Sequence, residues 1–130
     1  MASLTKLKRE FLFLKEKALG VLLFGSSAVD TSTARSDIDI CIVAPNQKPK
    51  DVLKTVYQKI DVYGKKYDVY TFEELPLYMK AEVLRNHRVI LARDEPALYE
   101  YLYSYRKFWD EQKHRQNVTK EELLGFKHLI

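Results

Sequence analysis

Two aspartates stand two positions apart in the segment Asp37-Ile38-Asp39, and these residues are well suited to chemistry. The segment leads into Ile40-Cys41-Ile42-Val43, and its alternation of acidic and β-branched residues predicts a strand, on which residues i and i+2 share a face. Like charges held that close resist ionising together unless a cation lies between them. Carboxylate oxygens suit Mg²⁺, which completes its shell with water and substrate phosphates. The functional interpretation is a magnesium site, and the alternative is a solvated acidic edge.

A second candidate, Gly25-Ser26, follows the short apolar run Val21-Leu22-Leu23-Phe24, which predicts a buried strand. Free backbone N–H groups and a hydroxyl at such a turn can hold an anion, and phosphate is the natural occupant. A glycine and serine after a strand are also common without any ligand. A third acid, Asp68, lies in the alternating segment Lys66 to Phe72 and completes the metal site if the two strands are neighbours.

These residues occur together in one arrangement. Leu23-Phe24-Gly25-Ser26 is followed, after a ten-residue spacer, by Ser36-Asp37-Ile38-Asp39-Ile40 and later by Tyr67-Asp68-Val69. The arrangement resembles the minimal nucleotidyltransferases of the DNA polymerase β superfamily. The specific likeness covers roughly residues 19–72, and the rest of the chain resembles the family in length and helix order.

The resemblance implies a mixed sheet flanked by helices, two Mg²⁺ ions and nucleotidyl transfer from a nucleoside triphosphate. Asp37 and Asp39 are then the paired metal ligands, and Asp68 is the third carboxylate that also serves the attacking hydroxyl. Gly25 and Ser26 form the phosphate-binding turn. Small stand-alone members of this family commonly act as antitoxins beside HEPN-domain ribonuclease toxins, and active ones transfer AMP from ATP to a tyrosine of the toxin.

The chain departs from the family pattern directly after the Gly-Ser pair. Many relatives carry arginine and glycine there, whereas this sequence has Ser27 and Ala28. Arg35, beside the aspartate pair, could reach the triphosphate instead, or it could be a solvated loop residue. Two alternatives therefore stay open beside protein adenylylation: nucleotidyl transfer to RNA or a small hydroxyl compound, and a binding antitoxin without catalysis.

The elements that must position these residues alternate between helix and strand periodicity. This order predicts a small α/β (α+β) fold in one domain over residues 1–130, with the catalytic motifs in 19–72 and a helical C-terminal part in 73–130. Helices are expected at 3–17, 52–60, 73–86 and 95–115, strands at 21–24, 37–43, 66–72 and 89–92, and a short extra helix at 119–124 from the capping-box pair Thr119 and Glu122.

The expected helix 95–115 is rich in aromatic residues. Its buried stripe is predicted to hold Leu98, Leu102, Tyr105 and Trp109, and the other faces carry the remaining aromatics, Tyr99, Tyr101, Tyr103 and Phe108. Aromatic residues on several faces favour either a protein interface or partial burial against neighbouring helices.

Composition excludes several other classes of protein. No apolar run approaches the length of a membrane span, and the lone Cys41 cannot form an intramolecular disulfide, so a cytoplasmic protein is expected. The net charge of +4 is dispersed along the chain and forms no basic stripe, so direct binding of nucleic acid is not expected.

Overall fold

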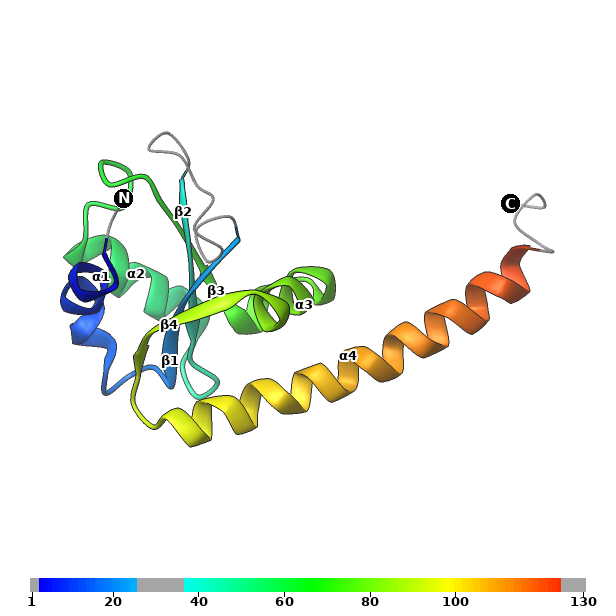
Figure 1. The fold of residues 1–130 in the computed structure, drawn as a ribbon. Coiled ribbons are helices and arrows are strands. Elements are labelled where there is room, and N and C mark those ends of the chain that lie inside the picture. Colours follow the sequence, from blue (N-terminus) through cyan, green and yellow to red (C-terminus); the bar gives the residue numbers. More distant parts are fainter. Residues whose placement is uncertain (1–2, 26–36, 125–130) are drawn as a thin grey trace.

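The computed structural model describes residues 3–25 and 37–124, with side chains described as far as residue 111. Helices and strands alternate along the chain, as expected (Figure 1). The elements are α1 (Leu4–Phe11), the 3₁₀ turn η1 (Leu12–Leu14), β1 (Gly20–Phe24), β2 (Ile38–Val43), α2 (Pro49–Lys59), β3 (Tyr67–Thr71), the 3₁₀ turn η3 (Phe72–Glu74), α3 (Leu77–Arg85), β4 (His87–Ala92) and α4 (Glu95–Leu124).

The four strands form one mixed sheet in the order β3-β2-β1-β4. β2 pairs in parallel with β3, whereas β1 pairs antiparallel with both β2 and β4. The two central strands, β1 and β2, carry the continuous apolar runs because both faces of the sheet are covered by helices. The predicted α+β architecture with a mixed sheet is confirmed.

Two hydrophobic clusters lie on opposite faces of this sheet. One packs β1, β2 and β3 against α1 and α2, and the other packs the opposite face against α3 and the start of α4 (Figure 1). Along β2, Ile40 and Ile42 point into the first cluster, whereas Cys41 and Val43 point into the second. Strict alternation therefore places the side chain of Asp39 on the α3/α4 face.

α4 is one continuous helix to Leu124, so the prediction of a separate short helix at 119–124 is wrong. No glycine or proline interrupts the sequence between Ala97 and Leu124. Thr119 and Glu122 are compatible with a helix interior, and a capping box acts only where the preceding residues leave the helix. In Figure 1 the second half of α4 runs away from the sheet, whereas its first half covers one face.

The expected helix 73–86 is divided in two. η3 covers Phe72–Glu74, and α3 begins only at Leu77, directly after Pro76. Leu75 adopts an extended conformation with φ −68° and ψ 140°, because a residue that precedes proline is disfavoured in the helical region. The first helix is also shorter than expected, since it ends in the 3₁₀ turn η1 and does not reach residue 17.

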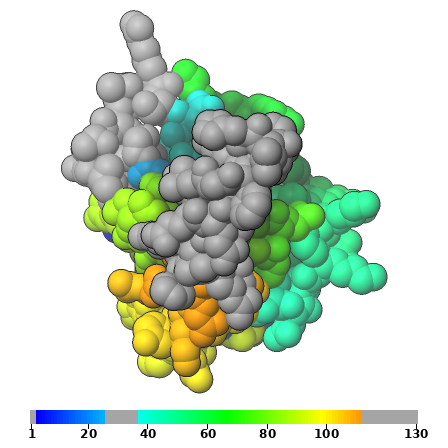
Figure 2. Space-filling model, turned by 90° about the vertical axis from the view of Figure 1, so that its right-hand side faces the viewer, coloured from blue at the N-terminus to red at the C-terminus, as the bar shows by residue number. Residues whose placement is uncertain are grey.

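The buried stripe of α4 is confirmed at Leu98 and Leu102, and Tyr105 packs against the same cluster. Tyr101 was expected on another face, but it also packs there and its hydroxyl donates to Glu73 at 2.9 Å. Tyr99, Tyr103 and Phe108 lie outside the buried stripe, as predicted, and they are exposed. Trp109 was expected in the stripe, but it is partly exposed and is not part of this cluster, so that prediction is wrong. Figure 2 shows this part of the molecule, where the yellow and orange atoms of α4 lie next to green and yellow-green atoms of the α3 and β4 region.

Candidate active site

The register of the sheet places four side chains in one row across the α3/α4 face. Asp39 on β2 is the pairing partner of Asp68 on β3, and it also pairs with Phe24 on β1. Phe24 in turn pairs with His87, the first residue of β4. Paired residues on neighbouring strands point to the same face, about 5 Å apart between strands. The two predicted carboxylates on β2 and β3 are therefore direct neighbours.

Asp39 shows the electrostatic cost of this arrangement. Burial raises the pKa of its carboxyl from 3.8 to about 6, and the negative charges of Asp68 and Asp37 add to the effect. The pKa of Asp68 is also raised, first by burial and then by the charge of Asp37 and a hydrogen bond to it. The charge of Asp37 thus acts on both other aspartates, although Asp37 is exposed and lies one residue before β2 begins.

Gly25 forms the turn beside this carboxylate pair. Its φ of 69° lies in the left-handed region, which a side chain rarely adopts. A Cβ atom at this position would collide with the Oδ2 atom of Asp39. Glycine is therefore required both for the backbone conformation and for the close approach of the turn to the carboxylate.

Carboxylate oxygens from two adjacent strands are the donor set that suits a hard divalent cation. Among the described residues, no group of three or more His, Cys, Asp or Glu side chains is arranged to hold a metal ion. The pair formed by Asp39 and Asp68 matches the one or two carboxylates with which Mg²⁺ is usually bound, its other oxygens coming from water and phosphate.

Two predicted site residues, Ser26 and Arg35, lie outside the described residues. Of the six predicted positions, the structure thus places Gly25, Asp37, Asp39 and Asp68, and it brings these four together at one edge of the sheet.

Two further side chains border the site, and neither was predicted to do so. The ring of Tyr70 packs edge-on against Phe24 at 5.6 Å between centroids, and its pKa is raised by burial and then by the charges of Asp68, Asp39 and Asp37. The alternation of β3 already placed Tyr70 on the face of Asp68. His87, whose Nδ1–H donates to the Val83 carbonyl oxygen at 2.8 Å, had no such signal because only the pairing of β4 with β1 brings it there.

The family model for polymerase β nucleotidyltransferases matches residues 7–96, which include every element of this site. The chain belongs to this family of nucleotidyltransferases. It is also similar to a protein of Methanocaldococcus jannaschii that is provisionally named a protein adenylyltransferase. The two are 39% identical over 127 residues, which covers 84% of this chain and 98% of the relative.

Solved structures share the fold at low sequence identity. One is a chain of a toxin–antitoxin complex with AMP-PNP, which is 14% identical, has a TM-score of 0.71, and matches 90% of this chain and 98% of that chain. Another comes from a complex of a tri-AMPylated HEPN toxin of Shewanella oneidensis with an MNT antitoxin. It is 12% identical, has a TM-score of 0.64, and matches 92% of this chain and 98% of that chain. Among the described residues, no helix is long and apolar enough to cross a membrane.

Proposed function

We propose that this protein is an antitoxin that transfers AMP from ATP to a tyrosine of a partner HEPN toxin. Family membership supports nucleotidyl transfer, and the provisional name of the M. jannaschii relative supports a protein as the acceptor. The fold neighbours support the nucleotide and the partner, because one complex holds AMP-PNP and another holds an AMPylated HEPN toxin. A cytoplasmic location is part of the proposal, since ATP is supplied there and the lone Cys41 is a buried free thiol.

The observation that carries the proposal is the pairing of Asp39 with Asp68 beside the Gly25 turn. In this proposal Asp37, Asp39 and Asp68 hold two Mg²⁺ ions. When bound, the ions neutralise charge on the triphosphate and lower the pKa of the attacking hydroxyl. The turn at Gly25 and Ser26 receives phosphate oxygens at its backbone N–H groups, and Arg35 contributes a cation to the same phosphates.

The protein itself mainly positions the triphosphate and the acceptor hydroxyl and accepts one proton. The tyrosine oxygen of the acceptor forms a bond to the α-phosphorus, the bond from that phosphorus to pyrophosphate breaks, and the hydroxyl proton passes to Asp68. Asp68 is suited to this role by its place, because it is a carboxylate on the strand next to Asp39. No covalent intermediate on the protein is required.

The proposal is tested by label transfer to the HEPN toxin encoded beside this protein, or to the toxin that co-purifies with it. We expect α-labelled ATP to label a tyrosine of the toxin and γ-labelled ATP to leave it unlabelled. Asp39→Asn should abolish labelling, whereas Asp51→Asn, an exposed aspartate in the first turn of α2, should leave it intact. Transfer of γ-label would indicate a kinase and contradict the proposal. Toxin neutralisation that persists in Asp39→Asn would instead indicate a non-catalytic antitoxin.

A further inference from the structure

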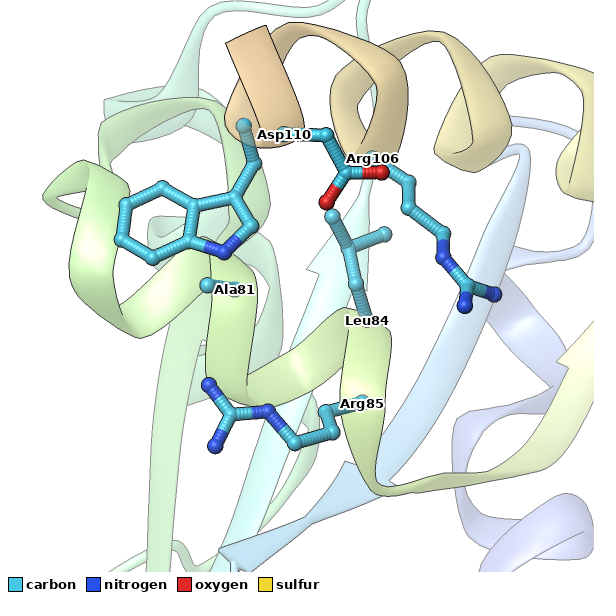
Figure 3. Close-up of a pocket in the computed structure, with 6 residues that line it drawn as sticks. Ala81, Leu84, Arg85, Arg106 and Asp110 are labelled. Carbon is cyan, nitrogen blue, oxygen red and sulfur yellow. The ribbon is translucent and has the colours of Figure 1, made fainter. Parts of the chain in front are cut away.

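Two adjoining hollows lie between α3, the start of β4 and the first half of α4. One has a volume of about 540 Å³ and is lined from α3 and α4 (Figure 3). The other has a volume of about 460 Å³ and is lined from α4, the end of α3 and the start of β4. Leu84 and Arg106 line both, so the hollows meet at these two residues. We call this surface the α3–α4 groove and define it by Leu84, Arg85, His87, Tyr103, Arg106 and Trp109.

The groove adjoins the carboxylates of the active site. His87 lines one hollow and also stands in the row that contains Asp39 and Asp68, on the same face of the sheet. Two strand spacings separate His87 from Asp39, which is about 10 Å. About three residues of extended chain span that distance. A segment bound in the groove can therefore present a side chain to the carboxylates.

The groove has the composition of a protein-binding surface rather than a small-molecule cavity. Arginine, tyrosine and tryptophan are the residues enriched at interface hot spots, and all three types line it. Tyr103 has 66% of its surface exposed, which leaves a large aromatic ring uncovered within the chain. Trp109 is partly exposed.

Two arginines and two acids line the hollows, and their positions determine which partner the groove fits. Arg85 reaches the hollow from α3 and Arg106 from α4, so the two side chains come from opposite helices (Figure 3). Both are exposed, and among the described residues neither forms an ion pair. Glu100 lines only one hollow and Asp110 only the other, whereas Arg106 stands where the hollows meet. An acidic group that enters the centre of the groove therefore meets Arg106 first.

We propose that the α3–α4 groove binds an acidic segment that flanks the acceptor tyrosine of the partner protein. This inference rests on the proposed function, because it assumes a protein acceptor. A carboxylate of the segment pairs with Arg106, and the neighbouring residues pack on Tyr103 and Trp109. Because about 10 Å separates Asp39 from His87, which lines the groove, residues about three to five positions from the tyrosine lie over the groove when the tyrosine lies at the carboxylates.

Binding can be measured directly, because Trp109 is the only tryptophan of the chain and its fluorescence reports on the groove. The probes are two synthetic peptides, each with one central tyrosine, that carry either glutamates or lysines at the positions three to five residues away. We expect the full-length protein to bind the glutamate peptide at least about tenfold more tightly than the lysine peptide. Arg106→Glu should abolish or reverse this preference.

Lys107→Glu is the matched control, because Lys107 is the next residue of α4, is exposed and lines neither hollow. It should keep the preference for the glutamate peptide. The proposal is overturned if the wild-type protein binds neither peptide or binds both equally. It is also overturned if Arg106→Glu and Lys107→Glu weaken the preference to the same extent. Circular dichroism checks that Arg106→Glu is folded, and Arg85→Glu provides a second variant from the opposite helix. Label transfer by the wild-type protein tests the proposed function separately, so the two failures are distinguishable.

Discussion

Removing one charge from the candidate active site should make the ligand-free protein more stable. Burial and the charges of Asp68 and Asp37 raise the pKa of Asp39 from 3.8 to about 6, so the folded state binds a proton more tightly than the unfolded state does. The stability associated with this proton is present below pH 4 and is lost as the pH rises through 6. Asp39→Asn keeps the size of the side chain and removes the ionisation, so it should abolish this loss.

The size of the effect follows from the difference between the two pKa values. Each pKa unit corresponds to about 1.4 kcal/mol, which sets an upper limit of about 3 kcal/mol at pH 8. Asp39 is partly exposed, and solvent screening reduces the expected gain to about 1 to 2 kcal/mol. For a domain of this size that gain raises Tm by about 3 to 10 °C.

The assay is urea unfolding in the presence of a chelator at pH 8 and pH 4. Asp39→Asn should be more stable than the wild type at pH 8, and most of the difference should be lost at pH 4. Asp51→Asn is the matched control, and it should give no gain because an acid in the first turn of α2 favours the helix. The explanation is wrong if Asp39→Asn is no more stable than the wild type at pH 8, or if its gain is the same at both pH values.

Four further outcomes are expected. Gly25→Ala should lower the rate of transfer at least about tenfold, because its Cβ would displace the Asp39 carboxylate and its φ is 69°; an unchanged rate would contradict this role. Lys66→Gly should raise the free energy of unfolding by about 1 kcal/mol in urea titrations, since Lys66 has a φ of 59°; a loss would indicate that its side chain stabilises the fold. Burial raises the pKa of Glu10, but hydrogen bonds from Lys65 at 2.6 Å and Tyr67 at 2.7 Å lower it more. Glu10→Gln should therefore lower the free energy of unfolding by about 1 kcal/mol at pH 7. In urea titrations this difference between the variant and the wild type should shrink as the pH falls below 4.5. Tyr103→Ala should weaken toxin binding, measured by calorimetry, by about 1 to 2 kcal/mol without lowering Tm, whereas lower Tm with normal binding would make this residue part of the core.

The sequence alone was sufficient to predict the strands of the sheet and to single out the acidic residues that the structure brings together. β1 and β2 are short and strongly apolar, and such a continuous apolar run predicts a central strand that is covered on both faces. Asp39 interrupts the second of these runs, and a charge in a central strand is costly unless an opposite charge or a bound cation compensates it. That conflict between an apolar strand pattern and a buried charge is what makes the site recognisable from the order of residues.

Helix boundaries were less predictable. Whether Thr119 begins a new helix or continues α4 depends on the backbone of the preceding residues, and the capping pattern is the same in both cases. The position of Tyr101 depended on a partner 28 residues away, since its hydroxyl reaches Glu73 in the turn η3. Helical periodicity describes the faces of one helix and contains no information on what lies opposite them.

Strand register was decided only by the tertiary structure. The sequence placed Asp39 and Asp68 on strands, but their direct pairing requires that β2 and β3 be parallel neighbours in one specific register. A shift of one residue would have turned one carboxylate to the opposite face. The same register brought His87 into the row and joined the α3–α4 groove to the active site, because β4 pairs with β1 across more than 60 residues of chain. The residue types and spacing determined which chemistry is possible, and the pairing of distant strands decided where in space it can occur.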